Sequence, residues 1–153
     1  MSEKAKVLIV DDQEVVRLSY LRSLGSEHCR VDVAASGEEA LLTMQQRKFD
    51  LVLLDLRMPG MDGMDVLRTI KQTWPDTEVV MITGYPTVET AKEAVRLGAH
   101  GYLAKPLGPD DIVNAANDAV IQKKWTLRKD CGNAGLGTGL HTDEWKKTEG
   151  AAC

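Results

Sequence analysis

Several features that this sequence lacks narrow the range of proteins it can be. Its cysteines, Cys29, Cys131 and Cys153, form no Cys-x-x-Cys pair or Cys/His spacing, which argues against a zinc site or a redox pair. The N-terminal apolar run, residues 7–10, is too short for a signal peptide, and no run approaches the length of a membrane span. We therefore expect a cytoplasmic protein with free thiols and no membrane contact.

An excess of positive charge is also missing. The chain has 23 acidic and 19 basic residues, a formal net charge of -4, so it has no general attraction for nucleic acids. The part after residue 123 is too short and too rich in glycine to hold a helix-turn-helix module. Direct binding to nucleic acid is therefore not expected.

The 153 residues suit one globular domain followed by a short tail. Periodic patterning stops near Lys129, and four glycines follow between residues 131 and 139. We expect a folded domain over residues 1–128 and a disordered, glycine-rich tail over residues 129–153.

Within the domain, short apolar runs alternate with segments of helical period. The runs cover residues 7–10, 31–34, 51–54, 79–82 and 102–104, and Asp32 interrupts the second, which suits an edge strand. A segment with helical spacing follows each run, and such long crossovers return the chain to a parallel strand. The pattern predicts an α/β fold in which helices cover both faces of a five-stranded parallel sheet.

A few residues mark where helices begin and end. Ser36 and Glu39 form a capping box, in which each side chain satisfies the other residue's backbone N–H. Thr87 is placed to cap a later helix, which Gly98 ends. The apolar side of that later helix is expected to comprise Val88, Ala91, Ala94 and Val95.

Polar side chains follow four of the runs at the point where each ends. Asp11 and Asp12 follow the first run, Asp55 the third, Thr83 the fourth and Lys105 the fifth. The carboxyl ends of parallel strands share one edge, where open α/β sheets bind their ligands. Carboxylates suit Mg²⁺, and a carboxylate attacking phosphorus forms an acyl phosphate whose oxygens a lysine and a hydroxyl can bind. These residues predict a Mg²⁺-dependent phosphoryl-accepting site with Asp55 as the nucleophile.

Four segments resemble the signature of bacterial response-regulator receiver domains. They are residues 7–12, 53–63, 82–84 and 101–106, in the order and with the spacings of that family. The resemblance covers residues 5 to about 124. It implies a flavodoxin-like (CheY-like) doubly wound fold, with five parallel strands in the order 2-1-3-4-5 and five helices.

The resemblance also implies a role for each matched acidic residue. Asp55 is then the phosphoacceptor. Mg²⁺ is then bound by Asp11, Asp12, Asp55 and the backbone carbonyl of Arg57.

The remaining matched residues belong to a switch. Thr83 and Lys105 are expected to bind the phosphoryl group, and Tyr102 is expected to turn from an exposed to a buried position on phosphorylation. The peptide between Lys105 and Pro106 is expected to be cis. Such a protein takes its phosphoryl group from a sensor histidine kinase and is no enzyme beyond its own phosphorylation and dephosphorylation. Its output is the surface of the fourth helix, fifth strand and fifth helix, which binds a downstream protein or a second copy.

Three other interpretations stay open. Residues 83–99 are similar to receivers of AAA+ (σ54-type) transcription activators, so the chain is a stand-alone receiver, which we favour, or the N-terminal part of such an activator. A Mg²⁺-dependent aspartyl-phosphate phosphatase uses the same chemistry, but its nucleophile belongs to an Asp-x-Asp motif, where this chain has Asp11, Asp12 and Gln13. A flavodoxin fits on fold alone, without its expected phosphate loop.

Two bulky residues stand at positions that vary in the receiver family. Arg57 and Tyr85 lie two residues after Asp55 and Thr83, respectively. Our hypothesis is that they shield the acyl phosphate from water and lengthen its lifetime.

Overall fold

The computed structural model describes residues 5–25 and 29–131, with side chains up to residue 120. The chain divides into two compact units, residues 1–123 and 124–153, and the first contains the whole sheet. The predicted tail lies outside the described residues from position 132 onward, and the boundary at residue 128 stays a prediction. Among the described helices, none combines the length and the apolar character needed to cross a bilayer.

Five parallel strands form a single sheet in the order β2-β1-β3-β4-β5, as predicted. Strand β2 lies at one edge, in agreement with its interrupted apolar run. The strands are β1 (Ala5–Val10), β2 (Cys29–Ala34), β3 (Leu51–Asp55), β4 (Glu78–Thr83) and β5 (Gly101–Ala104).

The register of these strands aligns the residues at their carboxyl ends. Val10 pairs with Leu54, and Asp55 pairs with Ile82. Thr83 pairs in turn with Ala104, the residue before Lys105. Side chains that follow β1, β3, β4 and β5 in the sequence therefore begin from the same edge of the sheet.

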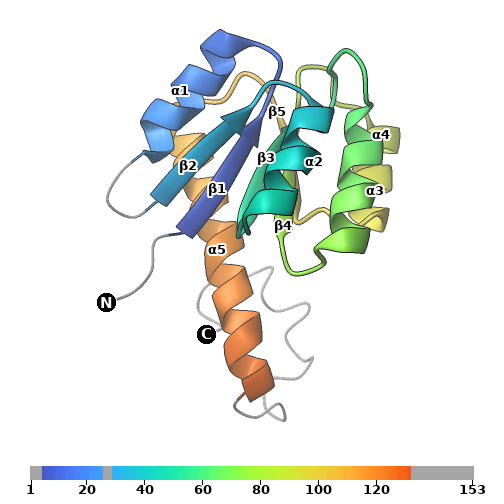
Figure 1. Cartoon of the computed structure of the whole chain (residues 1–153). Helices are drawn as coiled ribbons and strands as arrows, with labels where there is room; N and C mark the ends of the chain where they lie inside the picture. The colour runs from blue at the N-terminus through green and yellow to red at the C-terminus, as the bar shows by residue number, and fades with distance from the viewer. Residues whose placement is uncertain (1–4, 26–28, 132–153) are drawn as a thin grey trace. The chain divides into compact units, whose positions relative to one another are not determined.

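Five helices cover the two faces of the sheet (Figure 1). Helices α2, α3 and α4 pack on one face, and helices α1 and α5 pack on the other. Their bounds are α1 (Glu14–Leu24), α2 (Gly37–Gln46), α3 (Gly63–Thr73), α4 (Val88–Arg96) and α5 (Pro109–Cys131). Burial of apolar side chains on both faces is what holds such a sheet rigid, and β3 is fully buried along its length.

The predicted helix ends agree with the structure except for one detail. Thr87 and Thr90 form a complete capping box at the start of α4, and Gly98 takes the left-handed conformation, with φ at 103°, after its end. The Ser36 side chain accepts a hydrogen bond from the Glu39 N–H, as predicted. The Glu39 carboxylate, however, accepts from the Ala35 N–H at 2.8 Å and not from that of Ser36, because the chain before α2 is extended and presents the earlier amide.

The expected apolar side of α4 is wrong in part. Val88 is 65% exposed and Val95 is 64% exposed, and Ala94 is the one fully buried residue of this helix. The helix lies near the edge of the sheet, beside the four-residue strand β5. Only a narrow side of the helix therefore packs against the sheet. The two valines therefore lie at the surface of the protein.

Candidate functional site

The ends of β1, β3, β4 and β5 bring five of the predicted polar residues to one edge of the sheet. We call these residues the strand-end cluster: Asp11, Asp12, Asp55, Thr83 and Lys105. Three of their side chains are almost completely buried, with exposed fractions of 2% for Asp11, 5% for Asp55 and 0% for Thr83. Buried polar groups need partners, so their contacts show what the cluster can do.

Asp55 is bound on both of its carboxylate oxygens. The Arg57 N–H donates to Oδ1 at 3.2 Å, and the Lys105 Nζ lies 3.5 Å from Oδ2. The chain that follows Asp55 is fixed by its backbone, since the Leu56 N–H donates to the Ile82 carbonyl at 3.0 Å and the Gly63 N–H donates to the Leu56 carbonyl at 3.2 Å. The Asp55 carboxylate is therefore held at a defined position.

Gly63 makes this arrangement of the chain possible. A Cβ atom at this position would lie 2.6 Å from the Leu56 carbonyl oxygen and 2.8 Å from that of Asp55. Both contacts are with backbone atoms, which cannot rotate away as a side chain can. Glycine is thus required where α3 begins directly beneath the Asp55 loop.

Asp11 is bound more tightly than Asp55. Lys105 Nζ donates to its Oδ2 at 3.0 Å, and the Gln13 N–H donates to its Oδ1 at 2.9 Å. The Arg17 guanidinium donates to the Asp11 backbone carbonyl at 2.7 Å, which fixes the loop from the α1 side. Lys105 thus bridges two carboxylates that would otherwise repel one another.

The electrostatic balance of the cluster favours a bound cation. Burial and the charge of Asp11 raise the pKa of Asp55, Lys105 and the Arg57 N–H lower it, and the net result is a pKa of about 6. For Lys105, burial lowers the pKa, but the hydrogen bond and charge of Asp11 and the charge of Asp55 outweigh that effect and leave the pKa raised. One lysine does not fully compensate two buried carboxylates.

The third acidic residue completes a set of metal ligands. Asp11, Asp12 and Asp55 can each offer one carboxylate oxygen, and these three atoms lie within 4.8 Å of one another. Mg²⁺ prefers oxygen ligands and keeps several waters, so two or three carboxylates are an appropriate supply. The residues therefore fit a divalent cation. Because Asp12 is exposed, a cation bound there would be accessible to water.

Thr83 and Tyr102 lie on the same side of the sheet as α4 but have different partners. The Thr83 hydroxyl accepts a hydrogen bond from the Tyr85 N–H at 3.0 Å. The Tyr102 hydroxyl accepts from the Thr87 N–H at 3.3 Å and is also hydrogen-bonded to the Thr90 hydroxyl. We call Thr87, Thr90 and Tyr102 the hydroxyl cluster.

The peptide between Lys105 and Pro106 is cis. It lies directly after β5 and connects Lys105 of the strand-end cluster to the segment that leads into α5.

Comparison with known proteins identifies the chain. The family model for the response regulator receiver domain matches residues 7–117. The chain belongs to this family. The receiver fold and the membership predicted from the four signature segments are therefore confirmed.

The relatives of this receiver are longer regulatory proteins. It is 36% identical over 130 residues to Regulatory protein LuxO of Vibrio vulnificus, covering 84% of this chain and 28% of the relative. It is 37% identical over 109 residues to a putative NtrX-like response regulator of Rickettsia felis, covering 70% of this chain and 23% of the relative. The chain thus spans less than a third of the length of these curated relatives.

Solved structures agree with the fold of the receiver. A CheY-like receiver domain protein from Methanospirillum hungatei is 27% identical, with a TM-score of 0.78, and the match covers 81% of this chain and 99% of that one. NtrX from Brucella abortus is 30% identical, with a TM-score of 0.80, and the match covers 95% of this chain and 34% of that one. Receivers of this family act in two-component signalling, so a histidine kinase is the implied class of partner. The family is not one of classical enzymes, and its members generally bind Mg²⁺.

Several residues of the receiver's site were not identified from the sequence. Arg17 and Tyr20 were not singled out. Burial raises the pKa of Tyr20, Lys105 lowers it, and Asp11 and Asp55 raise it, which places the phenol within the field of the strand-end cluster. No sequence signal distinguishes such a tyrosine from an ordinary core residue.

Arg57 and Tyr85 contact one another above the site. The Arg57 guanidinium carbon lies 4.6 Å from the centre of the Tyr85 ring, in a cation–π contact. The two residues extend from the loops after β3 and β4, respectively. Their contact therefore joins the two loops that carry Asp55 and Thr83.

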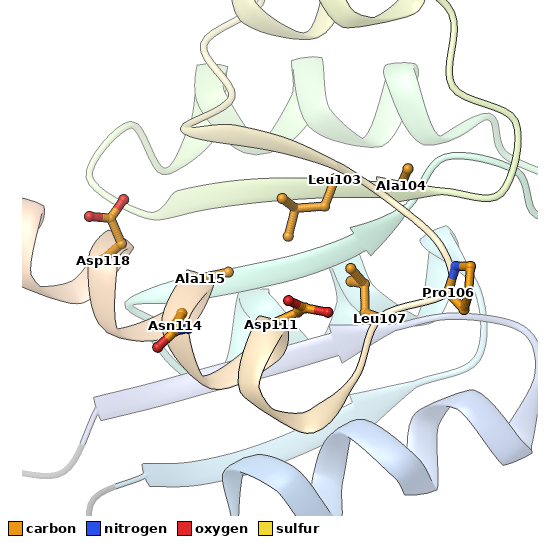
Figure 2. A pocket seen from close by; sticks show the side chains of 8 residues that line it. All are labelled: Leu103, Ala104, Pro106, Leu107, Asp111, Asn114, Ala115 and Asp118. Carbon is orange, nitrogen blue, oxygen red and sulfur yellow. The ribbon is translucent and has the colours of Figure 1, made fainter. Parts of the chain in front are cut away.

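A groove of the receiver lies outside this site. It has a volume of about 660 Å³ and lies between β5 and the first turns of α5 (Figure 2). Leu103 and Leu107 contribute apolar side chains to it, and its charged lining residues are Asp111 and Asp118. A groove with two acidic side chains and no basic one is a poor site for a phosphate group.

Proposed function

We propose that Asp55 accepts a phosphoryl group from a sensor histidine kinase. The observation that carries this proposal is the position of Asp55, which is buried, fixed on both oxygens and set beside Lys105 at the end of β3. The Asp55 Oδ atom attacks phosphorus, the bond from phosphorus to the donor's imidazole nitrogen breaks, and the electron pair of that bond stays on the imidazole. The product is an acyl phosphate on Asp55.

The positive charge that this reaction needs comes from two sources. Lys105 already lies between Asp11 and Asp55, so its ammonium group is placed to bind an oxygen of the new phosphoryl group. Asp11, Asp12, Asp55 and the Arg57 carbonyl would hold Mg²⁺, which supplies further charge neutralisation when bound. The chain then catalyses its own phosphorylation and dephosphorylation and no reaction on other substrates.

Phosphorylation changes the surface formed by α4, β5 and α5. Thr83 is buried at the end of β4 and would donate its hydroxyl hydrogen to a phosphoryl oxygen. Tyr102 lies between β5 and the start of α4 and would change position with it. A downstream protein or a second copy of the chain recognises the altered surface.

One observation favours a second form of this proposal. The chain covers 28% and 23% of the relatives LuxO and NtrX-like regulator, respectively. The domain of residues 1–128 would then be the phosphorylated front part of a longer regulator, with residues 129–153 as its linker. The chemistry at Asp55 is the same in both forms.

The test is phosphorylation by acetyl phosphate in the presence of Mg²⁺, followed by intact mass measurement. We expect the wild type to gain about 80 Da, the mass of one phosphoryl group, and Asp55→Ala to gain nothing. Asp65→Ala is the matched control, because Asp65 is exposed on α3 and pairs with Arg68. Equal adducts in the wild type and in Asp55→Ala would overturn the proposal. Steady release of phosphate from small esters would favour the phosphatase alternative.

A further inference from the structure

We infer that Thr90 is a positioning residue for the switch, which clamps the Tyr102 hydroxyl to the first turn of α4 until Asp55 is phosphorylated. This inference rests on the proposed function of Asp55 and adds to it the element that resists the conformational change. It assigns a role to a residue outside the strand-end cluster, on the helix next to it.

The hydroxyl cluster forms a closed set of hydrogen bonds. The Thr87 N–H donates to the Tyr102 hydroxyl at 3.3 Å, which leaves the tyrosine's own hydrogen free to be donated to the Thr90 hydroxyl. The Thr90 hydroxyl can then donate to the Thr87 carbonyl at 3.2 Å. The Thr90 hydroxyl also accepts from the Thr87 N–H at 3.4 Å and is hydrogen-bonded to the Thr87 hydroxyl at 2.9 Å. Tyr102 therefore belongs to the N-terminal cap of α4.

Thr90 has a double function in this arrangement. It is the partner of Thr87 in the capping box, where the Thr87 hydroxyl accepts from the Thr90 N–H at 3.0 Å. It is also a partner of Tyr102, which stands on a different element and 12 residues further along the chain. The cap of α4 and the side chain of Tyr102 are therefore coupled in their movement.

A short path connects this cap to the phosphoacceptor. Asp55 pairs with Ile82 in the sheet, and the Thr83 hydroxyl that follows Ile82 accepts from the Tyr85 N–H. Two residues later comes Thr87, whose N–H is bonded to Tyr102. If Thr83 is drawn toward a phosphoryl group on Asp55, the Tyr85 amide is drawn with it and the Thr87 amide is pulled away from Tyr102.

The intervening loop is exposed to solvent and is not packed into the core. Gly84, Tyr85 and Pro86 are exposed, and a Cβ atom placed at Gly84 would contact nothing within 4 Å. The hydrogen bonds to Tyr102, in contrast, are between neutral groups at a half-exposed position, where each contributes about 0.5–1.5 kcal/mol. Contacts of this size resist the change without preventing it.

The test measures the apparent affinity for beryllium fluoride, which with Mg²⁺ mimics a phosphoryl group on a carboxylate. Thr90→Val removes the hydroxyl with little change of shape, so we expect the resting state to lose its clamp and the affinity to rise by a factor of about 2–12. Tyr102→Phe should have a similar effect, and the double variant should gain less than the product of the two single effects. Thr90→Ser, which retains a hydroxyl, should bind as the wild type does.

The control is Thr43→Val on α2. The Thr43 hydroxyl donates to the Glu39 carbonyl of its own helix, so its loss should leave the affinity unchanged. A defect that merely loosened the fold would lower the affinity of Thr90→Val, whereas release of a clamp raises it. An affinity of Thr90→Val equal to or below that of the wild type overturns the inference.

A second measurement tests the clamp without phosphorylation. In urea unfolding of the ligand-free chain, Tyr102→Phe should raise the equilibrium constant for unfolding by a factor of about 2–12 in the wild type. In the Thr90→Val background the same substitution should have a clearly smaller effect, because only the bond from the Thr87 N–H is then lost. Additive effects of the two substitutions would show that no such contact exists. A wild type that takes no phosphoryl group at all would refute the proposed function of Asp55 instead, whatever the outcome of this cycle.

Discussion

The strand-end cluster and the hydroxyl cluster are connected by the loop between β4 and α4, but they are held by different forces. In the strand-end cluster, Asp11, Asp55 and Lys105 are charged and largely buried, with a hydrogen bond of 3.0 Å between Lys105 and Asp11. In the hydroxyl cluster, Thr90 and Tyr102 are neutral and half-buried. Hydrogen bonds that involve a charged group contribute about twice as much as neutral ones.

This difference suits the two tasks of a receiver. Phosphoryl transfer requires carboxylate and ammonium groups that are held in place before the reaction. The output, in contrast, requires contacts that break when Asp55 gains a phosphoryl group at the other end of the loop between β4 and α4. The same sheet edge thus presents a rigid site on β1 and β3 and an adjustable one between β5 and α4. Each prediction below tests one side of this contrast, and their expected effects decrease in order.

The largest effect is expected from a glycine substitution at the start of α3, compared with one in the loop before α4. Gly63→Ala should lower the free energy of unfolding by about 3 kcal/mol, because its Cβ would collide with the backbone of Leu56 and Asp55. Gly84→Ala should change it by less than about 0.5 kcal/mol, because that position is open. Urea unfolding of both variants gives the comparison. Equal losses would show that the Asp55 loop is no more rigid than the loop before α4.

The next effect concerns the ionisation of Asp55. Its pKa lies at about 6 in the folded chain, above the ordinary value of 3.8, so the folded chain binds more protons than the unfolded chain between these values. The stability that this group provides is therefore present at low pH and is lost as the pH rises from about 4 to about 6. Asp55→Asn should raise the unfolding free energy at pH 7 by about 2 kcal/mol in EDTA.

That gain should shrink as the pH falls below about 6 and should vanish below about pH 3, where the wild-type carboxyl is protonated in both states. Asp65→Asn, an exposed position on α3, serves as the control and should show no such pH dependence. A gain for Asp55→Asn that stayed constant across this pH range would contradict an electrostatic origin.

The third effect is stabilisation by Mg²⁺. At about ten times its dissociation constant, an ion that binds the folded chain alone should add about 1.4 kcal/mol to the unfolding free energy. Asp12→Ala should lose most of this addition, because Asp12 is one of three carboxylates in the cluster. Since Asp12 is exposed, the substitution should leave the stability in EDTA nearly unchanged. Full Mg²⁺ stabilisation of Asp12→Ala in thermal unfolding would remove Asp12 from the metal site.

The smallest effect is expected from the contact between Arg57 and Tyr85. An exposed cation–π contact contributes about 0.5–1 kcal/mol, so removing it should shorten the acyl-phosphate lifetime by a factor of about 2–5 if the pair excludes water. The double substitution to alanine is compared with Arg68→Ala, which removes an exposed arginine of α3. An unchanged rate of phosphate loss in the double variant would show that the pair does not shield Asp55.

The sequence was sufficient to predict the fold because its short apolar runs and its helically spaced apolar residues occupy separate segments of the chain. Runs such as residues 51–54 are too short for helices and uniformly apolar, and all five became strands of one parallel sheet. The four signature segments then placed Asp11, Asp55 and Lys105 at the ends of those strands. The sheet topology determines where the strand ends lie relative to one another, so it also determines the positions of the residues that follow them.

Contacts that depend on side-chain packing were not predictable in the same way. Helical spacing groups Val88 and Val95 with Ala94 on one apolar side, but it does not reveal that α4 lies near the edge of the sheet and leaves both valines exposed. The hydrogen bond between the Thr90 and Tyr102 hydroxyls joins residues of different elements, and no local sequence pattern predicts it. The Glu39 carboxylate accepts from the Ala35 N–H and not from that of Ser36, because the chain before α2 is extended, a backbone detail that the capping pattern does not specify.

The central claim is that a single carboxylate, that of Asp55, becomes the acyl phosphate. The most direct measurement is reduction of the phosphorylated chain with borohydride, which converts a phosphorylated aspartate to homoserine, followed by peptide sequencing by mass spectrometry. The account predicts homoserine at position 55 and aspartate at positions 11 and 12, with Mg²⁺ required for the change. Homoserine at position 11 or 12, or aspartate retained at position 55 in a chain that has gained a phosphoryl group, would contradict it.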